Sequence, residues 1–362
     1  MDQSQNLSEK NKSLQTENRR LRERLMELYV QINTLNAISD DLGMKASLSS
    51  ETLKYRRLSS AAANPFRFAQ TESLIIPGGA IYSASMSPKD ENIALASLSG
   101  SITIMTSDLK TSFVLPGHSL ACRDVHWSNI GLVSCGFDKL IKIWDVHSGT
   151  SQDFETNGLA HSVCGNADDL NTIFAASGDK IYWIDKRRDT PVTIPSDSPT
   201  TAVTLFKDYI IFGGYDGFIN IFDKRNLQSG RIAHIDLAGG PISSLSRVLD
   251  SGRCIASTVT SPHKMLIIGN EVNQVDLKND APGRFGCRAS INDKSLLFEG
   301  NHATVCGGKT AVFCDGAAGC VPQMLEDVGG FIYGALFMND ISQKILTYSE
   351  DGVVSVWSLH RF

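Results

Sequence analysis

From about residue 71 to its end, the chain alternates short hydrophobic runs with turn residues. The runs are rich in Ile, Val and Phe, as in Ile102–Met105, Ile141–Trp144 and Val353–Trp357. Runs of this kind are typical of buried or half-buried antiparallel strands. Gly-Asp and Asp-Gly pairs, such as Gly178-Asp179 and Asp216-Gly217, favour tight turns between neighbouring runs. The pattern therefore predicts an all-β fold made of short antiparallel sheets.

A longer pattern repeats through the same region with a period of roughly 40 residues. Its fullest copy contains Gly117-His118, Ser134, Asp138 and Trp144-Asp145. These residues resemble the repeats of the WD-repeat β-propeller family, in which each repeat supplies one four-stranded blade of a ring. The resemblance implies a seven-bladed propeller over residues 71–362. In chain order, the repeats are Ile81–Asp108, the copy ending at Asp145, Val163–Asp185, Ala202–Asp223, Ile242–Ile268, Leu296–Asp315 and Ile332–Trp357.

The fifth and sixth repeats follow the pattern least well. The expected strands of the fifth are Ile242–Leu245, Cys254–Ser257 and Met265–Ile268. The expected strands of the sixth are Leu296–Phe298, Ala303–Cys306 and Ala311–Asp315.

The ends of the propeller region are expected to pair with each other. The last strand, Val353–Trp357, lies only five residues from the end of the sequence, so no later segment can add an outer strand. The hydrophobic run Ser73–Ile76 precedes the first repeat and can supply that strand. We therefore expect backbone pairing between Leu74–Ile76 and Val353–Trp357, which closes the ring.

The first 42 residues have a different periodicity. Leucine occupies every seventh position from Leu7 to Leu42, without interruption by proline or glycine. A heptad repeat of this length predicts a coiled coil over residues 1–42, and Asn11 and Asn18 at the a positions favour a parallel two-stranded register. We expect a homodimer; the alternative is a helix that packs on another protein. The predicted dimer seam consists of Leu7, Leu14, Asn18, Leu21, Leu25, Leu28, Ile32 and Leu35.

Residues 43–70 are rich in Ser, Ala and basic residues, which predicts a linker between coiled coil and ring. Within it, Arg56-Arg57-Leu58-Ser59 resembles a site for basic-directed protein kinases. Short motifs of this kind occur often by chance, so a solvated basic patch is the favoured interpretation, and modification of Ser59 stays open.

Composition narrows the class of function. A formal net charge of −5 over 362 residues disfavours general nucleic-acid binding through phosphate neutralisation. The eight cysteines form no CxxC pair and no metal-ligand spacing with histidine, which indicates a reducing, intracellular environment. The polar N-terminus resembles no secretory signal, and no run of about 18 apolar residues is present. We therefore expect a cytoplasmic protein that contacts membranes only indirectly.

No catalytic, cofactor or metal motif stands out in the sequence. His118, Ser134, Asp138 and Trp144 invite comparison with a Ser-His-Asp triad. The WD-repeat resemblance implies instead that they form a structural hydrogen-bond network within one blade, and only the second repeat contains the whole set. We therefore expect a non-enzymatic protein without a cofactor.

Two adjacent repeats share an Asp-Lys-Arg sequence at the same place, at Asp185-Lys186-Arg187 and Asp223-Lys224-Arg225. The family resemblance implies either an ordinary blade end or the box by which some propellers dock on cullin ubiquitin ligases. Both copies lack the tryptophan of that box, so the ordinary interpretation is favoured. Asp185, Arg187, Asp223 and Arg225 remain candidates for adaptor docking. Arg187-Arg188 also does not fit the Phe-Arg-Arg-Gly motif of phosphoinositide-binding propellers.

A more specific resemblance joins the two parts of the chain. Glu17-Asn18, Leu21, Arg24 and Met26, followed by Gln31 and Leu35-Asn36-Ala37, resemble the coiled coil of the autophagy-related protein 16 family. Leu115–Ser119 through Trp144-Asp145, and on to Arg187, are similar to consecutive blades of that family.

This resemblance implies a dimeric scaffold in autophagosome formation. In the family, the N-terminal arm holds the conjugate of autophagy-related proteins 5 and 12 and directs lipidation of ubiquitin-like protein 8, while the ring recruits cargo or membrane adaptors. The family binds the conjugate through a short helix ahead of the coiled coil, and here the heptads begin within the first residues. The competing interpretations are a cullin-ligase substrate receptor and a nuclear co-repressor or splicing scaffold.

Overall fold

Residues from 64 onward form a unit separate from the preceding chain. The computed structural model describes residues 66–165, 171–188, 190–238, 240–246, 252–259, 264–268, 272–276, 290–292, 302–307, 310–315, 323–326, 331–338 and 344–361. The predicted coiled coil over residues 1–42, its dimer seam, and residues 43–65 of the predicted linker lie outside the described residues.

The described residues form seven four-stranded sheets, A to G, in which all paired strands are antiparallel. Sheet A contains β26 (Ile332–Phe337), β27 (Lys344–Ser349), β28 (Val353–Arg361) and β1 (Phe66–Ile75). Sheet B contains β2 (Ile81–Met86), β3 (Ile93–Ser97), β4 (Ile102–Met105) and β5 (Thr111–Leu115). Sheet C contains β6 (Cys122–Ser128), β7 (Gly131–Gly136), β8 (Leu140–Asp145) and β9 (Thr150–Glu155).

The remaining sheets repeat this order. Sheet D contains β10 (Ala160–Gly165), β11 (Thr172–Ser177), β12 (Lys180–Asp185) and β13 (Val192–Pro195). Sheet E contains β14 (Thr200–Phe206), β15 (Tyr209–Gly214), β16 (Phe218–Asp223) and β17 (Arg231–Asp236), with a short 3-10 helix, Leu227–Ser229, before β17. Sheet F contains β18 (Ile242–Leu245), β19 (Arg253–Thr258), β20 (Lys264–Ile268) and β21 (Val272–Asp276). Sheet G contains β22 (Ser290–Asn292), β23 (His302–Gly307), β24 (Thr310–Asp315) and β25 (Gln323–Glu326).

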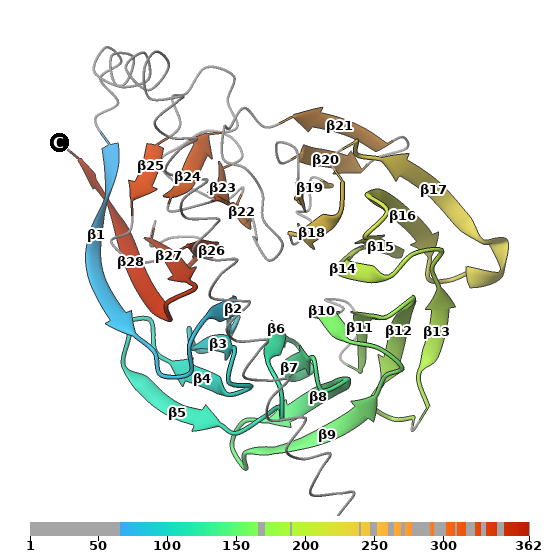
Figure 1. The fold of residues 1–362 in the computed structure, drawn as a ribbon, viewed down its shortest axis with the longest axis horizontal. Helices are drawn as coiled ribbons and strands as arrows, with labels where there is room; N and C mark the ends of the chain where they lie inside the picture. Colours follow the sequence, from blue (N-terminus) through green and yellow to red (C-terminus); the bar gives the residue numbers. More distant parts are fainter. Residues whose placement is uncertain are drawn as a thin grey trace, which may run out of the picture. The chain divides into compact units, whose positions relative to one another are not determined.

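The sheets stand radially around a centre, with one strand of each sheet innermost and one at the rim (Figure 1). Neighbouring innermost strands are in contact from β2 to β6, β10, β14 and β18, and from β22 through β26 back to β2. Contacts between β19 and β22 connect sheets F and G. The expected all-β propeller is therefore confirmed.

The two ends of the propeller region meet in sheet A. Strand β1 pairs with β28, with Leu74 opposite Val354 and Ile75 opposite Val353. The expected closing pair is confirmed, and Figure 1 shows β1 along the outer side of β28. The pairing extends further than expected, because β1 begins at Phe66, opposite Arg361. The predicted linker boundary at residue 70 is thus too late.

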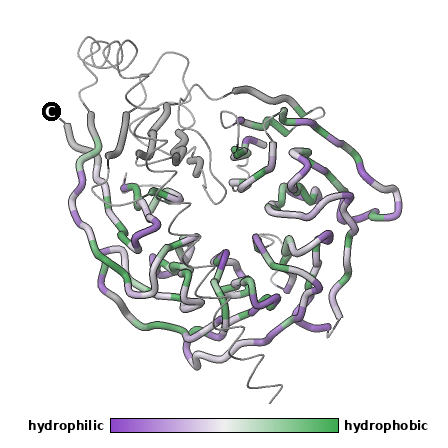
Figure 2. The backbone as a smooth tube through the Cα atoms, viewed as in Figure 1, coloured by the Kyte–Doolittle hydropathy of each residue, from purple (hydrophilic) through white to green (hydrophobic). Residues whose placement is uncertain are grey.

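Most of the hydrophobic core lies between neighbouring sheets. Ile102 and Ile104 of sheet B pack with Leu132 and Trp144 of sheet C, and similar clusters join C to D and D to E. Strands β3, β4 and β11 are buried along their whole length, because a sheet covers each of their faces. Each large aliphatic side chain buried in this way contributes about 1.5–3 kcal/mol. Hydrophobic stretches recur in the sheets, whereas the loops after β12 and β16 are hydrophilic (Figure 2).

The sixth repeat needs a correction. Its innermost strand is β22, Ser290–Asn292, which pairs with β23, whereas the sequence pattern predicted Leu296–Phe298. Residues 296–298 lie outside the described residues. Innermost strands line the centre of the ring and carry many serines, as in β2 and β18, so hydrophobicity is a poor guide to them. The strands of the fifth repeat are close to expectation, at β18, β19 and β20.

Candidate functional site

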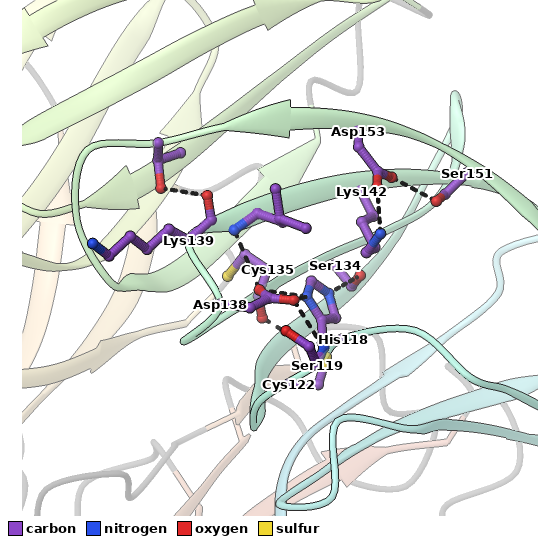
Figure 3. Close-up of polar contacts among 12 residues, drawn as sticks. His118, Ser119, Cys122, Ser134, Cys135, Asp138, Lys139, Lys142, Ser151 and Asp153 are labelled. Carbon is purple, nitrogen blue, oxygen red and sulfur yellow. Dashed lines mark hydrogen bonds and ion pairs between the residues drawn. The ribbon is translucent and has the colours of Figure 1, made fainter. Parts of the chain in front are cut away.

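The four polar residues of the second repeat meet inside sheet C. Figure 3 shows three of them together: His118, Ser134 and Asp138. His118 Nδ1 lies 2.9 Å from Asp138 Oδ1, and His118 Nε2 lies 2.8 Å from Ser134 Oγ. The indole Nε1–H of Trp144 donates to Ser134 Oγ at 2.9 Å. One chain of hydrogen bonds therefore runs from the loop before β6, through β7, to β8.

The pKa of His118 fixes the directions of the hydrogen bonds in this chain. Burial lowers this pKa below its ordinary value and outweighs the opposing effect of Asp138, so the imidazole is neutral near pH 7. Its Nδ1–H donates to the carboxylate of Asp138, which leaves Nε2 to accept the hydroxyl hydrogen of Ser134. Ser134 Oγ in turn accepts the indole hydrogen of Trp144, so every polar group in the chain has a partner.

Local sequence explains why these side chains can approach one another. A Cβ at Gly117 would lie 2.9 Å from the Trp144 ring, and one at Gly136 would lie 2.7 Å from His118 Nδ1. Both positions therefore require glycine. Asp138 also accepts hydrogen bonds from the backbone N–H groups of Ser119 and Leu140, which fixes the turn between β7 and β8.

The geometry of the network is structural, not catalytic. Ser134 has no exposed surface, and His118 is 7% exposed, so a substrate cannot reach the hydroxyl. A nucleophilic serine also needs its oxygen free for attack, whereas Ser134 Oγ accepts the indole hydrogen of Trp144. The network instead holds together β7, β8, the turn between them and the loop before β6.

Sheet A contains one bond of the same arrangement. Trp357 Nε1–H donates to Thr347 Oγ1 at 3.0 Å, as Trp144 does to Ser134. Sheets B and D use hydroxyl groups near the equivalent turns, with Ser97 bonded to Ser99 and Ser177 bonded to Thr156. The sequence pattern identified the full network but did not reveal these substitutes.

A buried carboxylate that the sequence analysis did not single out joins three sheets. Asp124 of β6 accepts a hydrogen bond from Ser83 Oγ of sheet B at 2.7 Å and from the Val163 N–H of sheet D at 2.9 Å. Its own side chain is buried, so these bonds are strong. The available signal was an aspartate within an otherwise buried strand.

The two Asp-Lys-Arg segments adopt the same geometry at the ends of β12 and β16. Arg187 Nε and Nη2 donate to the two oxygens of Asp185 at 2.8 and 2.7 Å. Arg225 makes the same pair with Asp223 at 3.0 and 2.7 Å. Hydrogen bonds from these arginines lower the pKa of both carboxyls to about 2.

Both arginines are nonetheless accessible. The side chains of Arg187 and Arg225 are 62% exposed, and Arg225 also contacts Asp208 at 3.1 Å. The structure therefore places two guanidinium groups, each oriented by its own aspartate, at the same end of adjacent sheets. This arrangement fits an ordinary blade end, with both ion pairs at the surface.

Within the part of the chain that the structure describes, no group of His, Cys, Asp and Glu has the arrangement of a metal site. In that same part, no helix is long and apolar enough to cross a membrane. Cys122, Cys135, Cys164 and Cys254 are buried free thiols, and burial raises the pKa of Cys254 to about 12. These thiols therefore pack as small apolar groups.

Comparison with known proteins supports the fold alone. No protein-family model and no curated protein matches the chain. Among solved structures, the β-propeller domain of Myceliophteria thermophila Cps50 (Swd1) is similar, with a TM-score of 0.64 and 17% sequence identity. The match covers 81% of this chain and 99% of that domain. Because 1599 solved chains match, the WD-repeat-like propeller by itself identifies no partner.

Proposed function

We propose that this protein is a non-catalytic dimeric scaffold whose propeller presents binding surfaces to other proteins. The proposal depends on the buried network of His118, Ser134 and Asp138. These residues are the set in the sequence that resembles a Ser-His-Asp catalytic triad, and they are buried and fully hydrogen-bonded. The predicted coiled coil over residues 1–42 supplies the dimer and doubles the number of binding surfaces, which raises avidity.

The proposed setting is autophagosome formation, in which the protein is an autophagy-related protein 16-like component of the ubiquitin-like conjugation machinery. Support comes from the resemblance of Glu17–Ala37 and of Leu115–Asp145 to that family. The scaffold acts in the cytoplasm and at autophagosome precursor membranes, which it reaches through its partners.

Proximity labelling and affinity purification test this function, with the full chain compared to a variant that lacks residues 1–42. We expect the full chain to recover autophagy-conjugation proteins and the truncated chain to lose them, together with dimerisation measured by light scattering. Recovery of spliceosome or chromatin proteins alone would replace the autophagy role by that of a nuclear co-repressor or splicing scaffold.

A second candidate function is that of a substrate receptor for a cullin ubiquitin ligase. It is favoured by the two oriented, exposed guanidinium groups of Arg187 and Arg225. This function predicts co-purification of a cullin adaptor and its loss in the Arg187→Ala/Arg225→Ala variant. Arg231→Ala is the matched control, because Arg231 pairs with Asp197 elsewhere on sheet E. Equal recovery of the adaptor by both variants would exclude docking through these arginines.

A further inference from the structure

One face of the ring, here called the turn face, carries the turns between the second and third strands of each sheet. In sheets A to F, a backbone hydrogen bond ties this turn to the loop that enters the innermost strand of the same sheet. For example, the N–H of Tyr215 donates to Pro199, and that of Phe137 donates to Ala121, at 3.1 and 3.0 Å. Equivalent bonds occur at Leu98, Gly178, Val259 and Glu350. The turns and the entering loops therefore build one continuous surface.

A β-bulge recurs on this face. In six sheets the pairing of the innermost strand shifts at its second residue, which redirects that side chain. The residues at the bulges are Tyr82, Arg123, His161, Thr201, Ser243 and Tyr333. In sheet D, the ring of His161 contacts Phe137 and Tyr215 edge-on, at 5.5 and 6.5 Å between centroids. Aromatic contacts thus connect sheets C, D and E near the centre of the face.

Four of the large exposed hydrophobic side chains of the described residues lie on loops of the turn face. Leu159 and Tyr215, from sheets D and E, are 43% and 44% exposed. Leu98 and Leu120 are exposed on the same face, at sheets B and C. The other large exposed hydrophobics of the described residues, Ile75, Phe113, Val114, Val192 and Ile232, lie on outermost strands. Apolar groups on loops that no neighbouring sheet covers are typical of a protein-binding surface.

The charges beside Leu159 and Tyr215 are mainly negative. Asp179 and Asp216 are exposed in the turns of sheets D and E, and Asp236 is exposed at the end of β17. Asp197 is also exposed there but is paired with Arg231. The nearby cations are Lys180, which is half-buried, and Lys139, which is exposed in the turn of sheet C, so they are fewer than the carboxylates. Arg123 is only 5% exposed and does not offset these carboxylates at the surface. The net field over this sector therefore attracts cations.

Hydrogen bonds hold the sector together as one rigid surface. The N–H of Gly178 donates to Leu159, and the N–H of Thr200 donates to Gly178, at 3.3 and 2.6 Å. The N–H of Ser196 donates to Asp179 at 2.8 Å, and the bond from Tyr215 to Pro199 completes the path from sheet D to sheet E. Leu159, Asp179, Tyr215 and Asp216 are therefore presented in a preformed arrangement, which reduces the entropic cost of binding.

We propose that this acidic sector, formed by Leu159, Asp179, Tyr215 and Asp216, docks a basic segment of a partner protein. The segment places an apolar or aromatic side chain against Leu159 and Tyr215, and Lys or Arg side chains against Asp179 and Asp216. This assignment rests on the proposed scaffold function and specifies the chemistry of one partner. Arg187 and Arg225, with their aspartate partners, lie on the opposite face of the same sheets.

The first experiment pans a phage library of random short peptides on the purified full chain. We expect enrichment of peptides that combine Lys or Arg with Leu or an aromatic residue. Enrichment of acidic peptides, or no enrichment over an uncoated surface, would overturn the proposal.

The second experiment measures the affinity of an enriched peptide by fluorescence anisotropy. The Asp179→Asn/Asp216→Asn variant preserves shape and hydrogen-bond acceptors, and we expect it to bind roughly tenfold more weakly and with less dependence on salt. The matched control, Asp108→Asn/Asp145→Asn, makes the same change of charge at exposed turns on the opposite face and should bind as the wild type does. Equal affinity of wild type and the asparagine variant would place the peptide elsewhere.

A third variant, Leu159→Ser/Tyr215→Ser, tests the apolar contact, and its thermal unfolding curve checks that the ring is intact. We expect a loss of affinity without a loss of cooperative unfolding. If none of the enriched peptides binds, but the full chain still recovers partner proteins from cells, the acidic sector is not a docking site. The proposed scaffold function would then still hold.

Discussion

Sheets C and A both place a tryptophan on their third strand, but they secure it differently. In sheet C, Trp144 begins a chain of hydrogen bonds through Ser134 and His118 to Asp138. In sheet A, Trp357 has one side-chain bond, to Thr347. Sheet A has instead β1 as its outermost strand, which pairs with β28 from about 285 residues away along the chain.

The difference shows two ways to stabilise the same unit. The bonds of sheet C join residues within one repeat, so this sheet depends on a buried polar network that is costly to leave half-satisfied. The stability of sheet A depends on pairing between the two ends of the propeller region. A change in sheet C therefore acts locally, whereas a change at β1 opens the ring.

The largest effect is expected from removal of β1. A chain that starts after residue 75 should lose several kcal/mol of unfolding free energy, because β28 and the faces around Leu74 become exposed. Urea unfolding followed by circular dichroism measures the loss. The control starts at residue 66 and keeps β1, so equal midpoints for the two truncated chains would show that the end-to-end pairing contributes little.

Next in size is Asp138→Ala in sheet C. This change removes the acceptor for His118 and for the backbone N–H groups of Ser119 and Leu140, so buried donors lose their partners. We expect a loss of about 2–4 kcal/mol in unfolding free energy. Differential scanning calorimetry with Asp145→Ala as the control tests it, because Asp145 is exposed and accepts from the backbone N–H groups of His147 and Ser148 in its own turn. A loss no greater than that of the control would count against the network.

A smaller effect is expected from Thr347→Val in sheet A. The valine keeps the shape but leaves the indole N–H of Trp357 without its acceptor, which costs about 1–2 kcal/mol. Ser134→Ala in sheet C should cost more, because it interrupts two bonds. Thr347→Ser retains the hydroxyl and should be close to wild type in chemical denaturation. A larger loss of unfolding free energy in Thr347→Val than in Ser134→Ala would show that the single bond in sheet A stabilises its sheet more than the network in sheet C does.

A further effect concerns pH and is absent at neutral pH. Burial lowers the pKa of His118, and burial together with Arg123 lowers that of His161 from 6.5 to about 4. Below pH 6.5 the unfolded chain binds protons that the folded chain does not, so stability falls as pH decreases towards 4. Above 6.5 these groups contribute no pH dependence. His161→Phe should reduce the acid slope in urea titrations, and an unchanged slope would show that His161 is solvated in the folded state.

The sequence indicated much of sheets B and C because their signals are local. Ile102–Met105 coincides with β4, and the full network followed from residue types at fixed spacing within one repeat. The start of β1 was missed because the pairing shifts between Gln70 and Glu72. A shift of this kind moves later side chains to the other face and breaks the alternation that marks a strand.

What the sequence by itself determined is the repeating unit: strands from hydrophobic runs, turns from Gly and Asp, and the glycines beside His118 and Trp144. Only the tertiary structure decided which distant residues share an environment. The bridge of Asp124 between sheets B, C and D and the grouping of Leu159 with Tyr215 depend on contacts between separate repeats. Such contacts leave no periodic signal, because they form only after the sheets have taken their places around the ring.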